Sequence, residues 1–282
     1  MLIFNKQEDL KNHLKSVSDQ NTTIGFVPTM GALHQGHLSL IENSLSENKI
    51  TVVSIFVNPT QFNNAEDLEK YPRTLEKDTK KIETVSKGVL IFAPSVEDIY
   101  EGNTVSASFN FDGLENQMEG EHRPGHFDGV GTIVKRLFEI VYPTNAYFGE
   151  KDFQQLQIVK KMVEKHNLSV NVIGCPIFRE ENGLAMSSRN ERLSAQERQD
   201  AALIYKTLKT AKEKFGTNSA KEIIKYVEDV FSKSPEFQLE YFQIADEDEL
   251  LPATTTKNDK KYRAFIAVFI NNIRLIDNIS LN

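Results

Sequence analysis

Residues 22–46 read TTIGFVPTMGALHQGHLSLIENSLS, and this stretch decides the fold class. Its first six residues are β-branched or apolar for the most part and predict a strand. The segment 37–46 predicts a helix, and Gly31 and Gly36 between the two permit close backbone approach and unusual dihedral angles. A strand that passes through a glycine-containing turn into a helix is typical of an α/β sheet.

The same alternation of strands and helices continues to about residue 178, which predicts a parallel sheet with helices on both faces. The run 50–57 is continuously apolar in character, so we expect this strand to be buried on both faces. The other expected strands are 89–92, 146–148 and 169–178, and the other expected helices are 9–17, 75–86, 129–141 and 153–166.

The last hundred residues follow a different pattern. Two helices are expected at 195–215 and 220–232, then strands at 239–245, 264–270 and 275–276, with a charged turn at 257–261. We therefore predict an α/β fold in which a Rossmann-like parallel sheet forms an N-terminal domain, 1–176. A smaller α+β lid forms a C-terminal domain, 177–282.

Composition limits the classes of function. The 282 residues are 39% apolar and 26% charged, which is sufficient for a packed core, and the net charge is −7. This acidic balance argues against binding to nucleic acid or to anionic lipid. The single cysteine, Cys175, excludes an intrachain disulfide and a cysteine-based zinc site, and we expect a buried thiol.

His34 and His37 carry the first chemical signal. They are three residues apart at the start of a helix, so they lie on one side of its first turn. Free N–H groups and the positive end of the helix dipole would complete a phosphate site with two imidazole donors. Alternatively, the two histidines only cap the loop. A metal site lacks a convincing third ligand, and the Gly-Lys-Ser/Thr of a Walker loop is absent.

Three other polar segments follow expected strands or lie near the domain boundary. Asn58 and Gln61 follow the buried strand, where amides suit hydroxyls and a carboxylate, unless they only form an Asn-Pro turn. In the segment 149–152, Lys151 could reach a phosphate and Asp152 could accept from ribose or cap a helix. The loop 186–189 offers two hydroxyls and a guanidinium for phosphate oxygens, or a serine pair that caps a helix.

Residues 34–37, HQGH, resemble the His-x-Gly-His signature of the nucleotidyltransferase superfamily, and the longer string around them resembles the pantothenate synthetase family. The matching segments occur in the family's order: PTMGALHQGHLSL (28–40), FVNPTQF (56–62), DLEKYPRT (67–74), RPGHFDGV (123–130), AYFGEKDFQQ (146–155) and CPIFREENGLAMSSRN (175–190). The resemblance covers nearly all of residues 22–193.

This resemblance implies an ATP-dependent condensation of pantoate with β-alanine through a pantoyl-adenylate, which releases AMP and pyrophosphate. It implies catalytic roles for His34, His37, Lys151 and Arg189, and contacts of Asn58, Gln61 and Gln155 with pantoate or β-alanine. The ATP contacts that it implies are Pro28, Met30, Gly31, Ala32, Leu33, His34, Gln35, Gly36, His37, Gly149, Glu150, Lys151, Asp152, Phe178, Met186, Ser187, Ser188 and Arg189.

We further expect a cytoplasmic enzyme of the coenzyme A pathway that forms homodimers and binds small molecules, not nucleic acid or membranes. Mg²⁺ would be held by the nucleotide and water, without dedicated protein ligands. Arg73, Arg123 and His126 match the family, although each could serve only as an anchor or a solvated charge. The family's features differ at Ala185, where no lysine precedes Met186, at Arg136, where lysine is common, and at Asn272-Ile273, which replace an expected glycine.

Two other functions stay open. A different nucleotidyltransferase would release a stable nucleotide-linked product instead of AMP. A catalytically silent nucleotide-binding module would bind ATP without releasing pyrophosphate. An aminoacyl-tRNA synthetase is disfavoured by the net charge of −7 and by the lack of a basic tRNA-binding module.

Overall fold

The computed structural model describes residues 1–253, 255, 257 and 259–282, so that Asn258 of the expected turn 257–261 lies outside the described residues. The chain divides into two compact units. Unit 1 consists of residues 1–115, 119–150 and 155–176, and unit 2 of residues 116–118, 151–154 and 177–282. Two short segments, 116–118 and 151–154, thus group with unit 2 although they precede residue 177.

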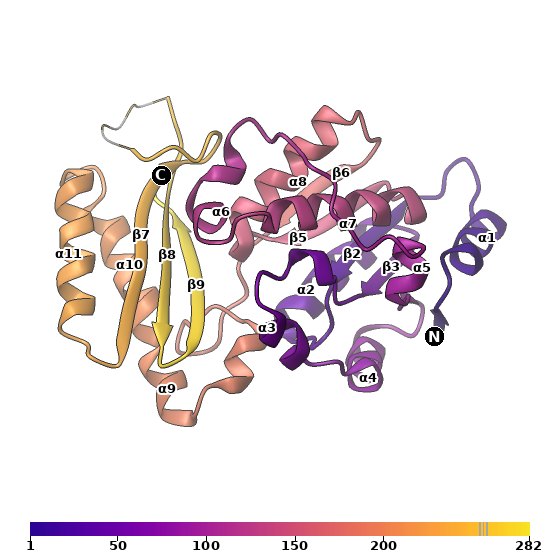
Figure 1. The fold of residues 1–282 in the computed structure, drawn as a ribbon, viewed down its shortest axis with the longest axis horizontal. Helices are drawn as coiled ribbons and strands as arrows, with labels where there is room; N and C mark the ends of the chain where they lie inside the picture. Colours follow the sequence, from indigo (N-terminus) through magenta and orange to yellow (C-terminus); the bar gives the residue numbers. More distant parts are fainter. Residues whose placement is uncertain (254, 256, 258) are drawn as a thin grey trace. The chain divides into compact units, whose positions relative to one another are not determined.

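Unit 1 is built on a six-stranded parallel sheet whose strand order is β1-β4-β3-β2-β5-β6 (Figure 1). The strands are β1 (Leu2–Phe4), β2 (Ile24–Thr29), β3 (Ile50–Ile55), β4 (Leu90–Phe92), β5 (Asn145–Gly149) and β6 (Asn171–Cys175). From β2 the chain builds outward to β3 and β4, and β5 then returns to the other side of β2. The strand order therefore reverses between β2 and β5, which is where open α/β sheets bind ligands.

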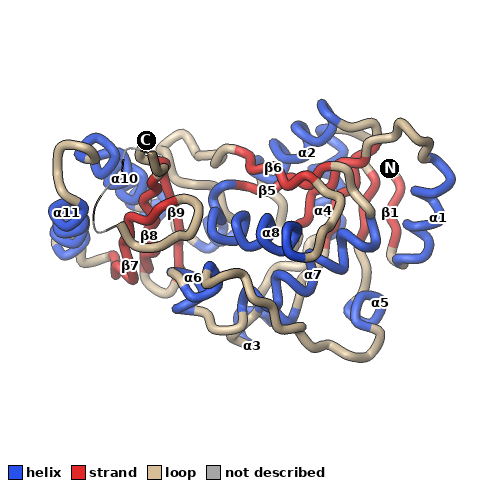
Figure 2. Tube along the Cα trace, turned by 90° about the horizontal axis from the view of Figure 1, so that it is seen from above, coloured by secondary structure: helices blue, strands red, loops and turns tan. Residues whose placement is uncertain are grey.

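Helices cover both faces of this sheet, as Figure 2 shows for α2 on one side of the strands and α7 and α8 on the other. Val27, Val53 and Tyr147 share the core with α2 and α4. On the opposite face, Phe26 and Phe148 each make an edge contact with Phe138 of α7. The helices are α1 (Gln7–Val17), α2 (Gln35–Glu47), α3 (Ala65–Lys70), α4 (Leu75–Val85), α5 (Val96–Tyr100), α6 (Met118–His122), α7 (His126–Val141) and α8 (Phe153–Lys165).

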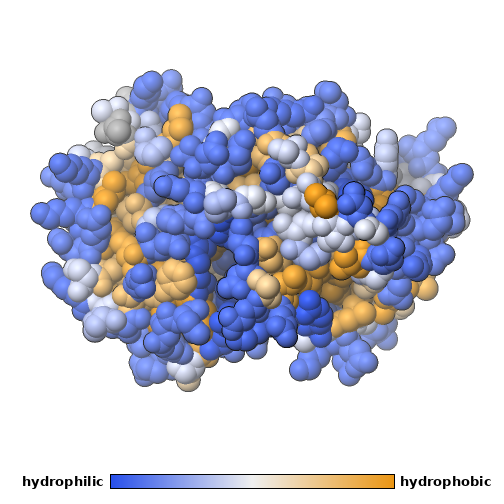
Figure 3. Space-filling view, viewed as in Figure 1, coloured by the Kyte–Doolittle hydropathy of each residue, from blue (hydrophilic) through white to orange (hydrophobic). Residues whose placement is uncertain are grey.

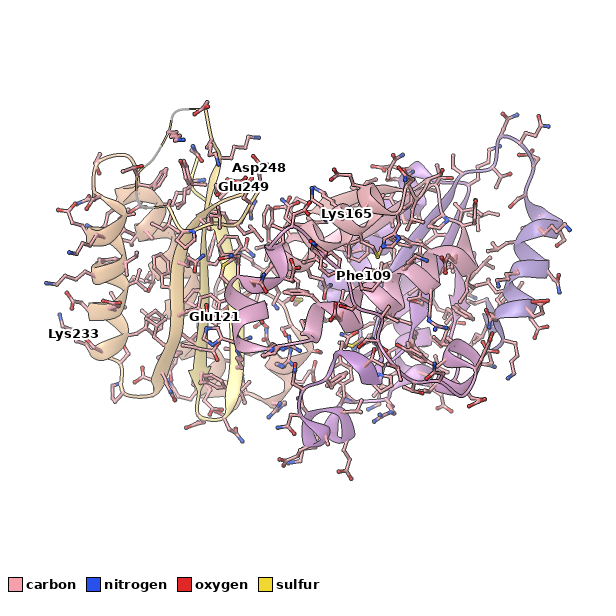
Figure 4. All side chains as sticks on the ribbon, turned by 45° about the horizontal axis from the view of Figure 1, so that its top comes forward. Phe109, Glu121, Lys165, Lys233, Asp248 and Glu249 are labelled. Carbon is pink, nitrogen blue, oxygen red and sulfur yellow. The ribbon has the colours of Figure 1, made fainter. Side chains whose placement is uncertain are left out.

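Unit 2 contains a three-stranded antiparallel sheet of β7 (Phe237–Asp246), β8 (Tyr262–Ile270) and β9 (Ile273–Ser280). Its helices are α9 (Ala195–Asp200), α10 (Ala202–Lys214) and α11 (Ala220–Ser232), and α10 and α11 run along the sheet in Figure 1. Ile204 and Leu208 of α10 and Ile223 of α11 join Ile266 and Leu275 of the strands in one apolar core. In Figure 4, Asp248 and Glu249 mark the turn that follows β7.

The predicted α/β class, with a parallel sheet followed by a smaller α+β part, is confirmed. The sequence prediction missed β1, α3, α5 and α6, and it placed a single helix at 195–215 where the structure has α9 and α10. Cys175 is buried as expected, and burial raises the pKa of its thiol. Hydrophilic side chains predominate on the face shown in Figure 3, and none of the described helices is long and apolar enough to cross a membrane.

Candidate active site

The loop between β2 and α2 takes two backbone turns that ordinary strands and helices lack. Gly31 has a φ of 86° and Ala32 a φ of 50°, both in the left-handed region that glycine adopts most readily. His34 is then the N-cap of α2 in an extended conformation, and its carbonyl accepts from the N–H groups of His37 (2.8 Å) and Leu38 (3.1 Å). The loop therefore brings residues 34–37 to the helix N-terminus, where free N–H groups favour an anion.

The structure brings the two imidazole rings together. Their centroids are 4.0 Å apart with an interplanar angle of 38°, and the backbone N–H of His34 donates to His37 Nδ1 at 3.2 Å. Because a backbone N–H can only donate, Nδ1 of His37 is an acceptor, and the proton of the neutral ring resides on Nε2. The loop thus selects the tautomer in which His37 Nε2 is a hydrogen-bond donor.

A buried carboxylate that was not among the residues predicted from the sequence holds this loop. Asp78 of α4 accepts from the backbone N–H of Ala32 (3.0 Å) and Leu33 (2.7 Å) and from the Thr74 hydroxyl (3.0 Å). Its exposed fraction is 0%, and Lys81, one helical turn further, donates to the Leu33 carbonyl at 2.6 Å. The backbone N–H groups of Ala32 and Leu33 are therefore held by charge-assisted hydrogen bonds.

A sequence signal for Asp78 does exist. Leu75, Asp78, Ile82 and Val85 follow one another at spacings of three and four, so the aspartate lies on the apolar stripe of its helix. A carboxylate on such a stripe is buried, and a buried carboxylate needs partners. That reasoning would have singled out Asp78 without the structure.

The segment after β3 forms a short 3-10 helix, η1 (Pro59–Gln61), with Asn58 as its buried N-cap. The Asn58 amide donates to Gln61 Oε1 (3.1 Å) and to the Gly129 carbonyl (3.1 Å), while its oxygen accepts from Tyr100 (2.6 Å). Since Gln61 Oε1 faces Asn58, the amide nitrogen of Gln61 is turned toward Met30, 3.3 Å from its sulfur. The loops after β2 and β3 thus meet at the side chain of Gln61.

Helix α7 fixes η1 from its other side. His126 Nδ1 lies 2.8 Å from the Gln61 carbonyl, and a Cβ added to Gly129 would lie 2.4 Å from the Thr60 carbonyl. Arg136 of the same helix donates to the Ile99 carbonyl at 2.8 Å and lies 5.0 Å from the Tyr100 ring centroid. His126 and Arg136 therefore anchor the loop that carries Gln61, directly or through Tyr100.

The segment 149–152 spans the division between the units, with Gly149 and Glu150 in unit 1 and Lys151 and Asp152 in unit 2. Gly149 ends β5, next to the point where the strand order reverses. Within unit 2, Lys151 Nζ lies 3.9 Å from Asp152 Oδ1, and the Lys151 carbonyl accepts from the Asn278 amide at 2.9 Å. The Lys151 side chain is largely shielded from solvent, with an exposed fraction of 16%.

Phe178 and Met186 lie opposite each other in a hairpin, because the Met186 N–H donates to the Phe178 carbonyl at 2.9 Å. The hairpin turns at Gly183, whose φ is 91°. Ser187 then caps the 3-10 helix η4 (Ser188–Arg192) by accepting from the Arg189 N–H at 3.2 Å. The capping role left open from the sequence is thus present at Ser187, and the same turn brings its hydroxyl next to the backbone of Arg189.

The remaining sequence candidates lie in less specialised surroundings. Gln155 is half-buried on α8, whereas its neighbour Gln154, which the sequence did not single out, is buried and donates to the Gln117 carbonyl at 2.7 Å. Arg73 is exposed and donates to three backbone carbonyls at the end of α3. Arg123 pairs with Glu119 at 3.7 Å. Among the described residues, no group of three or more His, Cys, Asp or Glu side chains could hold a metal ion.

Comparison with known proteins places this geometry in a family. The chain matches the family model for pantoate-beta-alanine ligase over residues 2–280. A pantothenate synthetase of Flavobacterium psychrophilum is 65% identical over 281 residues, which is 100% of both chains. The structure of the pantothenate synthetase of Thermus thermophilus is 40% identical, with a TM-score of 0.90 over 100% of this chain and 99% of that chain.

A second solved relative was determined with bound ligands. It is the pantoate-beta-alanine ligase of Francisella tularensis complexed with beta-gamma ATP and beta-alanine, 35% identical, with a TM-score of 0.82 over 100% of this chain and 98% of that chain. The family model and these relatives extend over the glycine loop, η1 and the hairpin alike. The chain belongs to the pantoate-beta-alanine ligase family.

Proposed function

We propose that this chain condenses pantoate with β-alanine to pantothenate at the expense of ATP, through a pantoyl-adenylate. The observation that carries the proposal is the loop 30–37, where a buried aspartate fixes two backbone turns and His37 is set as an Nε2 donor at a helix N-terminus. Membership of the pantoate-beta-alanine ligase family supplies the substrates.

In the first step the pantoate carboxylate attacks the α-phosphorus of ATP and pyrophosphate leaves. Negative charge grows on the phosphoryl oxygens and on the leaving group. Hydrogen-bond donors and cations that already point at these oxygens therefore stabilise the transition state. His34 and His37 donate to phosphate oxygens, Lys151 supplies a positive charge, and Ser187, Ser188 and Arg189 bind the pyrophosphate oxygens. The other ATP contacts are Pro28, Met30, Gly31, Ala32, Leu33, Gln35, Gly36, Gly149, Glu150, Asp152, Phe178 and Met186.

Gln61 binds pantoate through its amide nitrogen. Asn58 already has two acceptors and Tyr100 as a donor, so it acts through Gln61 by holding Oε1 and thereby orienting the amide. Gln155 binds pantoate from α8. In the second step the neutral β-alanine amine attacks the carbonyl carbon of pantoyl-adenylate, the bond to the phosphate oxygen breaks, AMP leaves, and the amine nitrogen gives up one proton to solvent as the amide forms.

Mg²⁺ would enter with ATP and would be held mainly by phosphate oxygens and water, the oxygen ligands that it prefers. The protein is a cytoplasmic homodimer of the coenzyme A pathway. Light scattering of the purified chain would measure the number of subunits.

The test is an ATP consumption assay in which pantoate and β-alanine are omitted in turn. We expect AMP to accumulate only when both are present, and ATP–pyrophosphate exchange to require pantoate alone. A stable nucleotide-linked product would indicate a nucleotidyltransferase. ATP binding without pyrophosphate release would indicate a silent nucleotide-binding module, and either result would contradict the proposal.

A further inference from the structure

The dipeptide Asp277-Asn278 on β9 connects two segments of unit 2 that the proposed function assigns to ATP. Both side chains are buried, with exposed fractions of 4% and 2%. Because consecutive strand residues point to opposite faces of a sheet, the two side chains leave β9 on different sides. Asp277 is opposite Ile266, which packs in the core with α10 and α11, and Asn278 is opposite Phe265, whose ring lies 5.9 Å from that of Phe153.

On the helix-covered face, Asp277 holds the hairpin that leads to Ser187. Arg179 donates to its two carboxylate oxygens, from Nη1 at 2.7 Å and from Nη2 at 2.9 Å, which is the bidentate geometry of a strong ion pair. Arg179 also donates to the Gly183 carbonyl at 3.0 Å and lies 3.7 Å from the Tyr205 ring centroid. Asp277 therefore fixes the turn of the hairpin through one guanidinium. Burial raises the pKa of its carboxyl, while Arg179 opposes that shift.

On the other face, Asn278 holds the backbone of Lys151. Its Nδ2 donates to the Lys151 carbonyl at 2.9 Å, and its Oδ1 accepts from Arg263 Nη1 at 2.6 Å. An arginine can only donate, so the amide oxygen must face Arg263, and the nitrogen must face Lys151. Arg263 is itself placed by Glu247 at 2.9 Å and by Phe153, whose ring centroid lies 3.9 Å from its guanidinium carbon.

We propose that Asp277 and Asn278 are a positioning pair which holds Lys151 and the loop Ser187–Arg189 in a fixed relation for ATP binding. The inference rests on the proposed function, because it assigns these two segments to the same nucleotide. Neither residue touches the nucleotide: Asp277 acts through Arg179 and the hairpin, and Asn278 acts through the Lys151 backbone. The consequence is that each residue matters only while the group that it positions is present.

Asn278→Asp tests this, because it is isosteric, keeps the oxygen that accepts from Arg263, and replaces the donor to Lys151 by an acceptor. We expect pantoate-dependent ATP–pyrophosphate exchange to fall about tenfold in the wild-type background. In the Lys151→Ala background the same change should lower exchange less than about twofold, since residues that act through one group are not additive. Equal losses in both backgrounds would overturn the role of Asn278.

Asp277→Asn is tested in the same way, by measuring exchange after this change in the wild-type background and in the Arg189→Ala background. Arg179→Lys serves as a second variant if Asp277→Asn does not fold, because it keeps the charge but loses the bidentate geometry. Glu240→Gln is the matched control. It applies the same acid-to-amide change to another arginine pair of this sheet, Arg274–Glu240, whose Nε–Oε2 distance is 2.9 Å, and exchange should stay within about twofold.

The wild-type protein separates the two levels of the proposal. Pantoate-dependent exchange in the wild type together with additive losses in the variants would overturn the positioning pair and leave the proposed function in place. A folded wild-type chain without exchange would overturn both. Losses that vanish in the Lys151→Ala and Arg189→Ala backgrounds, with Glu240→Gln unchanged, would establish the pair.

Discussion

The glycine loop of unit 1 (residues 30–37) and the hairpin of unit 2 (residues 178–186) are each held by a buried aspartate. The two aspartates differ in how directly they contact the backbone next to the residues that are proposed to bind ATP. Asp78 accepts directly from the Ala32 and Leu33 N–H groups, adjacent to His34. Asp277 holds the Arg179 side chain, and only the hairpin that follows leads to Ser187. In unit 1, Asp78 also satisfies the hydrogen-bonding needs of buried backbone N–H groups. Loss of its carboxylate should therefore reduce the stability of the fold and the activity together.

The largest effects should come from the side chains themselves. His37→Ala in unit 1 and Lys151→Ala in unit 2 should each lower kcat by on the order of 10²-fold or more, because in the proposed function each side chain stabilises charge that develops in the transition state. Steady-state AMP formation measures this. Lys160→Ala removes an exposed lysine of α8 and should leave kcat within about twofold. Near-normal turnover in either folded variant would remove that residue from the chemistry.

His37→Gln sharpens the first of these predictions. Gln can donate a hydrogen bond but cannot transfer a proton near neutral pH, so it separates the two roles of imidazole. If His37 only donates from Nε2, the variant should keep about a tenth or more of kcat, and the pH–rate profile should keep its shape. Loss of a titrating limb together with loss of activity would instead identify His37 as a general acid.

Asp78→Asn should follow in magnitude. One carboxylate oxygen becomes an NH₂ group that faces a buried backbone N–H, so we expect a loss of about 2–3 kcal/mol in the free energy of unfolding. Exchange should fall by about ten- to thirtyfold as Ala32 and Leu33 shift. Thr74→Val is the control, since it removes only the third hydrogen bond, at a cost of about 1 kcal/mol. Equal losses in denaturant titrations of the two variants would show that the backbone contacts of Asp78 carry no special weight.

Gly31→Ala should have a smaller effect through the same contact. At a φ of 86°, an added Cβ would lie 3.1 Å from Asp78 Oδ2 and 3.2 Å from Ile55 Cγ2, so strain and crowding add to about 1–2 kcal/mol. Gly113→Ala separates the two, because its φ is 90° but no described atom lies within 4 Å of the new Cβ. Only Gly31→Ala should reduce exchange. Identical stability and unchanged exchange in both variants would contradict the crowding argument.

Asp78 and Asp277 also show which parts of the site could not be predicted from the sequence. The loop 28–40 could be predicted because its strand, glycines and histidines are contiguous. Asp78, Tyr100 and Asn278 act across 46, 42 and 127 residues of chain, and no local pattern encodes those partners. A hint existed only for Asp78, a charge on an apolar helical stripe.

More of the fold than of the site could be predicted from the sequence, because the spacing of apolar residues along a helix or strand is a local pattern. The buried strand at 50–57 was predicted from its apolar run, but β1 has only three residues, and its strand character comes from pairing with β4, 88 residues away. The break between α9 and α10 falls at Ala201, where neither glycine nor proline marks a helix end. Strand β1 and the break between α9 and α10 were not predicted because both are determined by tertiary packing and not by the local sequence.

Tyr147 gives the smallest effect, at the opposite end of α2 from the histidines. Its hydroxyl donates to Glu47 at 2.7 Å and accepts from Asn48 at 2.7 Å, and burial together with Glu47 raises its pKa to about 12. The unfolded phenol titrates near pH ~10. Between these two pH values the folded state therefore keeps the phenol proton while the unfolded state loses it. The contribution of Tyr147 to the free energy of unfolding is fully present below about pH 10 and is lost as the pH rises toward about 12.

We expect Tyr147 to contribute about 1–2 kcal/mol of this alkaline loss, less than the full value for such a pKa difference, because the unfolded chain retains some structure. Denaturant titrations of the wild type and of Tyr147→Phe between about pH 9 and 11.5 measure it as the difference between the two curves. Parallel curves would show that the raised pKa does not stabilise the fold. Exchange at neutral pH should stay within about twofold in Tyr147→Phe, because Asp78, and not the far end of α2, fixes the loop that carries the histidines.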